Sequence, residues 1–97
     1  MKKWKETRIN LGVLVEGETV RFEFHTEAPL KVKEFQKGCG TCTTIESFDG
    51  NILKVKYKAE VVPPQVEGDW TPTKYIKVFY EDGTQEQLYF IAKIKRK

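Results

Sequence analysis

The sequence is poor in the residues and segments that mark several common classes of protein. Its 97 residues include two cysteines and one histidine, so a zinc site within one chain would have to add His25 or carboxylates to the cysteines. A chain of this length can bury a single core without metals or disulfide staples. No apolar stretch approaches the ~18 residues that a membrane helix needs, and none of ~7 to 15 residues follows the basic start of the chain. We therefore expect no membrane segment, no signal peptide and synthesis in the cytoplasm.

Motifs that would indicate catalysis are also missing. His25 ends an alternating segment on its polar face, and no Ser, Cys or Asp has a spacing that nominates a triad with it. Gly38 and Gly40 are not followed by a helical pattern, so no phosphate-binding loop is indicated. The carboxylates are scattered singly along the chain. The sequence therefore predicts a protein that is not an enzyme and that holds no cofactor and no metal.

The excess of positive charge is small. Lys and Arg number 17 against 14 Asp and Glu, which gives a net charge of +3. Much of this excess comes from residues at the two chain ends, namely Lys2, Lys3, Lys5, Lys93, Lys95, Arg96 and Lys97. Charge at the termini is most often a solvated tail. We therefore do not expect nucleic acid or an anionic surface to be the main partner.

What the sequence does contain is strict alternation of apolar and polar residues, which is typical of half-buried strands. The alternating segments are residues 18–26, 30–33, 53–57, 75–80 and 88–94, with shorter ones at 7–10 and 43–46. No window of the chain holds a helical period. Glycine or asparagine stands in the connections at 16–17, 48–51 and 81–84, and Asp82-Gly83 is the clearest signal of an antiparallel hairpin. These features predict an all-β protein, an immunoglobulin-like β-sandwich of about seven antiparallel strands that forms one domain over residues 1–97.

One connection departs from the short turns. Residues 60–73 contain Pro63, Pro64 and Pro72 and show no alternation. Loops of this length in a compact domain are usually functional or disordered. The alternative is that Trp70 folds back as a lid over one end of the core.

The two cysteines, Cys39 and Cys42, lie in a turn between two strand-like segments. A redox enzyme would place such a pair at the start of a helix, which lowers the pKa of one thiol, and the residues after Cys42 are β-branched instead. The pair therefore indicates either a disulfide or two inert thiols. In the cytoplasm we expect reduced thiols, so that the fold does not depend on a disulfide.

Three segments together resemble a known family. They are residues 11–20 (LGVLVEGETV), residues 30–40 (LKVKEFQKGCG) and Trp70 followed by residues 75–78 (YIKV). The pattern is similar to the bacterial and phage immunoglobulin-like domains that carry a Cys-Gly-Cys element, relatives of the Hydin and major-sperm-protein types. It spans residues 8–94 and differs in that Thr41 stands between Gly40 and Cys42. The resemblance implies a structural domain, and free-standing domains of this kind are similar to accessory decoration, neck or tail proteins of tailed-phage particles.

The last two strands are apolar on both faces, whereas the outer face of a sandwich strand is normally polar. With Ile76, Val78, Leu88 and Phe90 in the core, the opposite face presents Tyr75, Phe79, Tyr89 and Ile91. Together with the loop around Trp70, these residues predict a surface that binds a partner protein or a second copy of the chain. The alternative is that the segment around Trp4 or the proline-rich loop covers them.

The function predicted from the sequence is therefore that of a non-enzymatic, protein-binding immunoglobulin-like domain, assembled into a virion. The alternative is a small basic β-domain that binds single-stranded nucleic acid through its terminal lysines and exposed aromatic residues.

Overall fold

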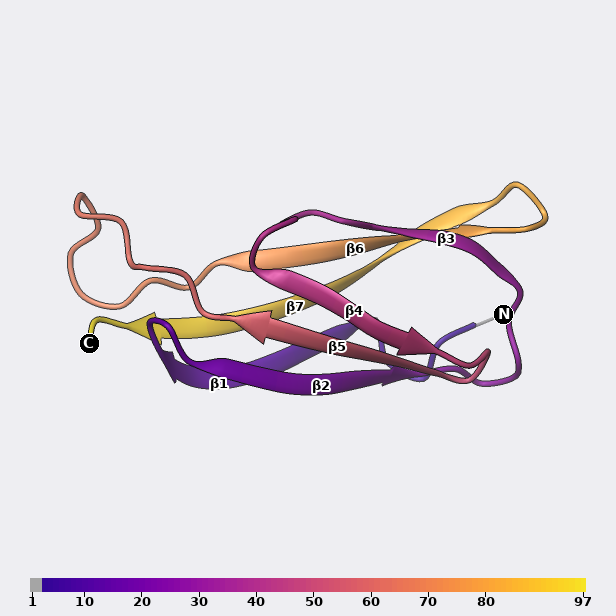
Figure 1. The fold of residues 1–97 in the computed structure, drawn as a ribbon, viewed down its shortest axis with the longest axis horizontal. Coiled ribbons are helices and arrows are strands. Elements are labelled where there is room, and N and C mark those ends of the chain that lie inside the picture. The colour runs from indigo at the N-terminus through magenta and orange to yellow at the C-terminus, as the bar shows by residue number, and fades with distance from the viewer. Residues whose placement is uncertain (1–2) are drawn as a thin grey trace.

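A computed structural model describes residues 3–97 as a β-sandwich; Lys2, one of the terminal cations, lies outside the described residues (Figure 1). The seven strands are β1 (Arg8–Val15), β2 (Thr19–His25), β3 (Val32–Lys37), β4 (Thr43–Phe48), β5 (Ile52–Lys58), β6 (Thr73–Tyr80) and β7 (Gln85–Lys95). They form one sheet of order β1-β7-β6-β3 and a second of order β2-β5-β4. The all-β sandwich predicted from the alternation is confirmed. Residues 3–97 include no helix that is long and apolar enough to cross a membrane.

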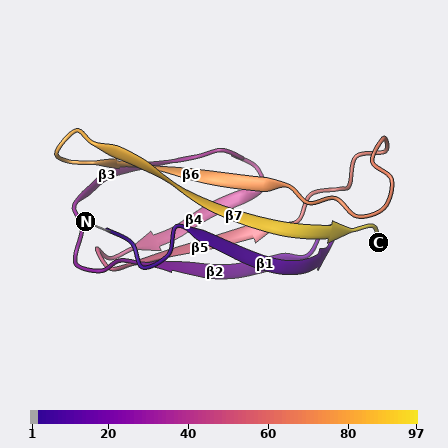
Figure 2. The same ribbon diagram turned by 180° about the vertical axis from the view of Figure 1, so that it is seen from behind.

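One strand pair differs from the prediction of an antiparallel sandwich, because β1 runs parallel to β7 (Figure 2). The turn after Val15 carries the chain from the first sheet to the second, so β1 and β2 are not hairpin partners. β1 instead lies along the free edge of β7, with Arg8 opposite Tyr89 and Asn10 opposite Ile91. Alternation shows which face a residue occupies and does not show the partner strand, which is why the sequence did not reveal this pair.

The hairpin predicted at Asp82-Gly83 is present between β6 and β7. The Tyr80 N–H donates to the carbonyl of Thr84 at 2.9 Å. Gly83 has a φ of +90°, a conformation that side chains other than glycine's disfavour. The strand expected at residues 30–33 begins only at Val32 and continues to Lys37, because Leu30 hydrogen-bonds to the loop carbonyl of Gly50 instead of a strand.

The core consists of the inward positions of both sheets. The fully buried members from the two central strand pairs are Phe24, Leu53, Val55, Tyr57, Ile76, Val78, Leu88, Phe90 and Ile94. Aromatic rings join the sheets, since Phe22 and Tyr57 of one sheet lie 4.9 and 5.3 Å from Phe90 of the other, ring centre to ring centre. The faces predicted for β6 and β7 are therefore confirmed.

The segment before β1 fills one end of the sandwich. Trp4 is 1% exposed and its indole N–H donates to the Tyr80 hydroxyl at 2.8 Å. Its ring packs against Phe24 and Phe48. Trp4 therefore belongs to the core, and the alternative in which it covers the outer face of the last hairpin is wrong.

Candidate functional site

The outer face of the β1-β7-β6-β3 sheet brings together four of the five residues expected at an interaction surface. Tyr75 and Tyr89 lie directly opposite each other on β6 and β7, and Ile91 lies between Thr73 and Asn10 of the neighbouring strands. Tyr75 is 38% exposed, whereas Tyr89 and Ile91 are half-buried by their neighbours on the same face. These residues form an aromatic and apolar strip across the middle of the sheet.

Phe79 lies on the same face at the hairpin end of β6. It is half-buried between Glu34 of β3 and Gln85 of β7, its cross-strand partners. Lys77 separates it from Tyr75 along the strand. Phe79 therefore extends the strip at its edge and does not belong to its centre.

Ile91 forms the floor of a shallow groove where β1 bulges away from β7. The pairing shifts between Asn10 and Val13, and Gly12 in the bulge has a φ of +81°. Two adjoining hollows of about 180 and 300 Å³ open on either side of Ile91. We call this surface the outer groove and define it by Arg8, Asn10, Thr73, Tyr89, Ile91 and Lys93.

Positive charge surrounds the outer groove. The guanidinium carbon of Arg8 lies 5.1 Å from the centre of the Tyr89 ring, within the range of a cation–π contact. Lys93 lies beside Ile91 on β7 and pairs with Asp69 at 3.4 Å. Because β7 continues to Lys95, the lysines at 93 and 95 stand on an ordered strand, and the prediction that they form a solvated tail is wrong.

The position of Tyr75 depends on Gly38, the residue that follows β3. The Gly38 N–H donates to the Tyr75 carbonyl at 2.9 Å. A Cβ on Gly38 would lie 2.6 Å from Cε1 of the Tyr75 ring. The ring therefore rests against the backbone of Gly38, which is possible only because this residue has no side chain.

Trp70 does not lie on this face, which corrects its assignment to the interaction surface. It pairs with Ile94 through two backbone hydrogen bonds of 3.0 and 2.7 Å, so the two side chains share one side of the sheet. Ile94 is fully buried, and Trp70 packs against the same core. The alternative of a lid over one end of the sandwich describes its position. The sequence gave no guide here, because the loop lacks the alternation that would have shown which side Trp70 faces.

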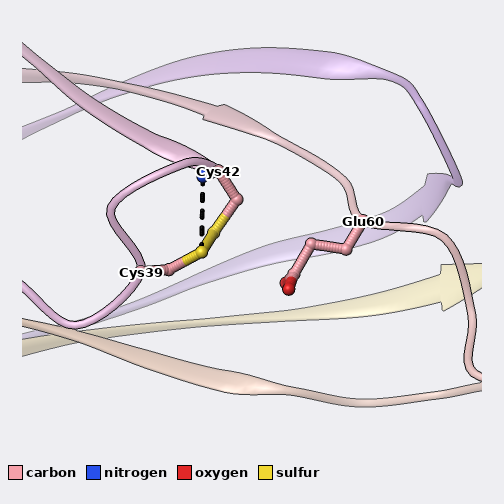
Figure 3. Close-up of side chains that lie close together, drawn as sticks. All are labelled: Cys39, Cys42 and Glu60. Atoms are coloured by element: carbon pink, nitrogen blue, oxygen red, sulfur yellow. Dashed lines mark hydrogen bonds between the residues drawn. A yellow bond between two sulfur atoms is a disulfide. The ribbon is translucent and has the colours of Figure 1, made fainter.

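A second cluster lies at the end of the sandwich where the proline-rich loop begins. Cys39 and Cys42 form a disulfide in the turn that joins β3 to β4, and Glu60 reaches them from the loop after β5 (Figure 3). One ligand-capable atom from each of these three residues lies within 4.8 Å of the others. Of the two alternatives left open by the sequence, the structure contains the disulfide. Because the crosslink closes a loop of only a few residues, the chain-entropy model gives it about 2 kcal/mol.

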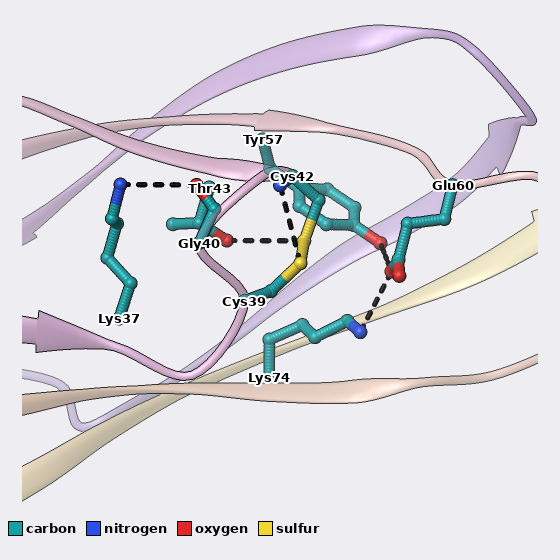
Figure 4. Close-up of a disulfide and its surroundings, with 8 residues drawn as sticks. All are labelled: Lys37, Cys39, Gly40, Cys42, Thr43, Tyr57, Glu60 and Lys74. Atoms are coloured by element: carbon teal, nitrogen blue, oxygen red, sulfur yellow. Dashed lines mark hydrogen bonds and ion pairs between the residues drawn. A yellow bond between two sulfur atoms is a disulfide. The ribbon is translucent and has the colours of Figure 1, made fainter.

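Glu60 is held in place by two further side chains (Figure 4). Its Oε1 accepts a hydrogen bond from the Tyr57 hydroxyl at 3.2 Å and pairs with Lys74 Nζ at 2.8 Å. Burial, with the negative charge of Glu60 beside it, raises the pKa of the Tyr57 hydroxyl well above its ordinary value. The hydroxyl therefore stays protonated and remains a donor. Sequence reasoning missed Glu60, because nothing in a loop residue far from Cys42 signals that the chain folds back beside it.

His25 lies far from the cysteines. It is paired with Ile52 at one end of β5, whereas Cys42 bonds to Lys58 at the other end. Its ring contacts Glu23 and Glu6 at 3.1 and 3.5 Å. His25 therefore has no part in the cysteine cluster.

Comparisons with known proteins define the fold only. No family model and no curated protein matches the chain. Among solved structures it is similar to the sialic acid binding region of the Streptococcus sanguinis SK1 adhesin bound to 3'sLn, with a TM-score of 0.53 at 9% identity over 96% of this chain and 28% of that chain. It is also similar to the endo-fucoidan hydrolase MfFcnA4 from glycoside hydrolase family 107, with a TM-score of 0.54 at 13% identity over 97% of this chain and 13% of that chain. The chain thus spans only a small part of either, and the class that fold and comparisons define is an all-β, immunoglobulin-like sandwich.

Proposed function

We propose that this chain is a non-enzymatic immunoglobulin-like domain that binds a partner protein through the outer groove. The observation that carries the proposal is the pairing of Tyr75 with Tyr89 beside Ile91 on a sheet face that would ordinarily be polar. Tyrosine and arginine are the residue types that most often dominate binding at protein interfaces. Arg8 and Tyr89 supply both types at one point of the groove.

The charges of this face indicate the kind of partner. By the strand register, the outward positions include Arg8, Lys77, Lys93 and Lys95, and Glu34 is the carboxylate among their cross-strand neighbours. A basic rim around an apolar centre complements a partner surface with acidic residues around an apolar projection. As the setting we propose an accessory decoration, neck or tail protein of a phage particle, an idea supported by the sequence resemblance alone.

The proposal is tested with two substitutions that add the same charge at different places. Ile91→Glu places a carboxylate in the outer groove, whereas Val61→Glu places one on the proline-rich loop, where Val61 is 73% exposed. A photo-crosslinking residue at position 89 should capture a partner that the same residue at position 61 does not. With that partner purified, Ile91→Glu should weaken the complex at least about tenfold and Val61→Glu should not. Equal affinity of the two variants would reject the outer groove.

The stability of Ile91→Glu decides whether this comparison is meaningful. A half-buried outward residue should cost roughly 1 kcal/mol when replaced. Thermal melting of the isolated variant measures this cost. A loss of several kcal/mol would show that Ile91 belongs to the core and that the proposed interface is wrong.

The second candidate function is binding of single-stranded nucleic acid. It is favoured by the placement of Lys93 and Lys95 on the same strand and face as Tyr89, because cations interleaved with aromatic rings suit stacked bases. Fluorescence anisotropy with a labelled oligonucleotide should then show an affinity that falls steeply with salt and that Tyr89→Ala weakens. Absence of binding at low salt would eliminate this candidate. An acidic glycan belongs in the same assay, since one structural neighbour binds sialic acid.

A further inference from the structure

We propose that Cys39, Cys42 and Glu60 form a zinc site when the disulfide between the two cysteines is reduced. The three residues supply two thiolates and one carboxylate, and a fourth position remains for water or for a donor from a partner. This site lies at the end of the sandwich and is independent of the outer groove.

The turn is already shaped as a two-sulfur chelate. Cys-x-x-Cys brings both Sγ atoms to one point, and the Cys42 N–H donates to Cys39 Sγ at 3.3 Å. A hydrogen bond to sulfur stabilises the thiolate, which is the form that binds metal. The geometry of the turn therefore serves the reduced pair as well as the disulfide.

Glu60 completes a three-ligand set at a suitable distance. The donor atoms of the three residues lie within 4.8 Å of one another. Around tetrahedral zinc, with Zn–S bonds of about 2.3 Å, neighbouring donor atoms are separated by about 3.7 Å. Rotation of the Cys and Glu side chains is sufficient to close this difference. Both contacts from Tyr57 and Lys74 go to Oε1 of Glu60, so Oε2 remains to bind the metal.

The surrounding charges balance such a site. Two thiolates, one carboxylate and Zn²⁺ carry a net charge of −1, and the Lys74 ammonium lies 2.8 Å from the carboxylate. Lys74 thus neutralises the occupied site. The Tyr57 hydroxyl orients the carboxylate, in the way that outer-sphere hydrogen bonds orient metal ligands in general.

An approach from solvent is present. A hollow of about 340 Å³ is lined by Thr41, Cys42, Lys58, Glu60 and Val61 and opens beside the cluster. Cys42 itself is only 6% exposed. A metal ion can therefore reach the donors, and the open fourth position would face this hollow.

The chemistry balances as two separate steps. Two molecules of a thiol reductant give two electrons and two protons to the disulfide, which becomes two cysteine thiols while the reductant becomes its own disulfide. Binding of the divalent ion to the two thiols then releases two protons. The same residues would therefore hold either a crosslink or a metal, according to the redox conditions.

The experiment uses the whole chain and Co²⁺ as a spectroscopic probe. The disulfide is first reduced with a phosphine, which takes up one oxygen from water and leaves both sulfurs protonated. Titration with Co²⁺ should then give a thiolate-to-cobalt charge-transfer band that saturates near one ion per chain, and Zn²⁺ should displace the cobalt. The oxidised protein should give no such band.

Glu60→Gln is the decisive variant, because Gln can still accept the Tyr57 hydrogen bond but is a poor zinc ligand. It should weaken binding at least about tenfold, while Glu67→Gln in the same loop should leave it unchanged. Circular dichroism checks that each variant is folded, and Glu60→Asp provides a second test that keeps the carboxylate but shortens its reach. Saturation near half an ion per chain would mean that two chains share one metal through four cysteines. That result, unchanged affinity in Glu60→Gln, or absence of binding to the reduced protein would each overturn the proposal.

Discussion

At the scale of single residues, Gly38 controls the outer groove although it makes no side-chain contact of its own. The Tyr75 ring occupies the space that a Cβ at position 38 would need, with ring atoms at 2.6, 2.8 and 2.9 Å from that point. Such distances are too short for real atoms, so a substitution has to displace the ring. The shape of the interaction surface therefore depends on a glycine in the turn before the cysteines.

Gly38→Ala is expected to move Tyr75 away from its position opposite Tyr89 and to weaken partner binding. The change should cost about 1 kcal/mol or less in stability, because Tyr75 is 38% exposed and its ring can turn toward solvent. NMR chemical shifts of the Tyr75 ring and the melting temperature measure the two effects. Gly40→Ala is the matched control, since nothing lies within 4 Å of its added Cβ. Unchanged Tyr75 shifts in Gly38→Ala would contradict the described packing.

At the scale of elements, the proline-rich loop is ordered by a residue near the chain end. The Arg96 guanidinium donates to the carbonyls of Pro63, Val66 and Gly68, with bonds of 2.9 Å to Pro63 and 3.3 Å to Gly68. Hydrogen bonds from a charged donor are stronger than neutral ones. Together with the bridge between Trp70 and Ile94, these bonds fasten a loop that has no strand of its own.

Arg96→Ala should loosen this loop with little effect on the rest of the sandwich. Hydrogen exchange at the Val66 and Trp70 amides should become faster, and a protease should cut the loop sooner, while the melting temperature changes by only a few degrees. Lys97→Ala removes the same charge one residue later and should change none of these. Equal exchange rates in the two variants would show that Arg96 does not order the loop.

The two tightest turns are stabilised by ionised aspartates. Asp82 accepts hydrogen bonds from the Thr84 hydroxyl and N–H at 2.6 and 2.9 Å, and these lower the pKa of its carboxyl below the ordinary value. Asp49 accepts from the N–H groups of Ile52 and Asn51 at 2.8 and 2.9 Å, which lowers its pKa as well. A carboxyl whose pKa is lowered in the folded state stabilises that state above the unfolded pKa, and this contribution is lost as the pH falls through the folded value.

The free energy of unfolding should therefore decrease as the pH is lowered below about 4, the ordinary pKa of aspartate. Asp49→Asn with Asp82→Asn keeps a side-chain oxygen as acceptor but removes both titrations, so the decrease should become shallower. Denaturant unfolding at several pH values between neutral and strongly acidic measures the slope. Glu67→Gln removes a carboxylate outside these turns and serves as the control. An equally steep decrease in the double variant and in the wild type would contradict this explanation.

At the scale of elements the sequence also shows how far local patterns reach. Alternation predicted the inward faces of β6 and β7, and Asp82-Gly83 predicted their hairpin, because both signals depend on neighbours in the chain. The parallel pairing of β1 with β7 and the approach of Glu60 to Cys42 depend on how distant segments meet in space. For the same reason the side of the sheet that Trp70 faces could not be read from its loop.

At the scale of the whole molecule, Trp4 joins the two ends of the chain. Its indole packs on Phe24 and Phe48 of the second sheet and donates to Tyr80 of the first. The Tyr80 hydroxyl in turn donates to Glu86 of β7. Burial, and next the bond to Glu86, raise the pKa of Tyr80 well above its ordinary value, so this hydroxyl remains a donor. The segment before β1 is thus part of the single core and not an appendage.

Trp4→Ala is therefore expected to destabilise the entire sandwich by about 3 to 5 kcal/mol, the range for removing a buried large aromatic side chain. For a domain of this size, that corresponds to a decrease in melting temperature of at least about 12 °C. Trp4→Phe should cost clearly less, because a ring still fills the space between Phe24 and Phe48 and the Tyr80 hydroxyl keeps its bond to Glu86. Trp70→Ala is the comparison at the opposite end, where the indole is only half-buried and its loss should cost less than that of Trp4. Denaturant unfolding of the three variants gives the order, and a smaller loss for Trp4→Ala than for Trp70→Ala would show that the segment before β1 does not close the core.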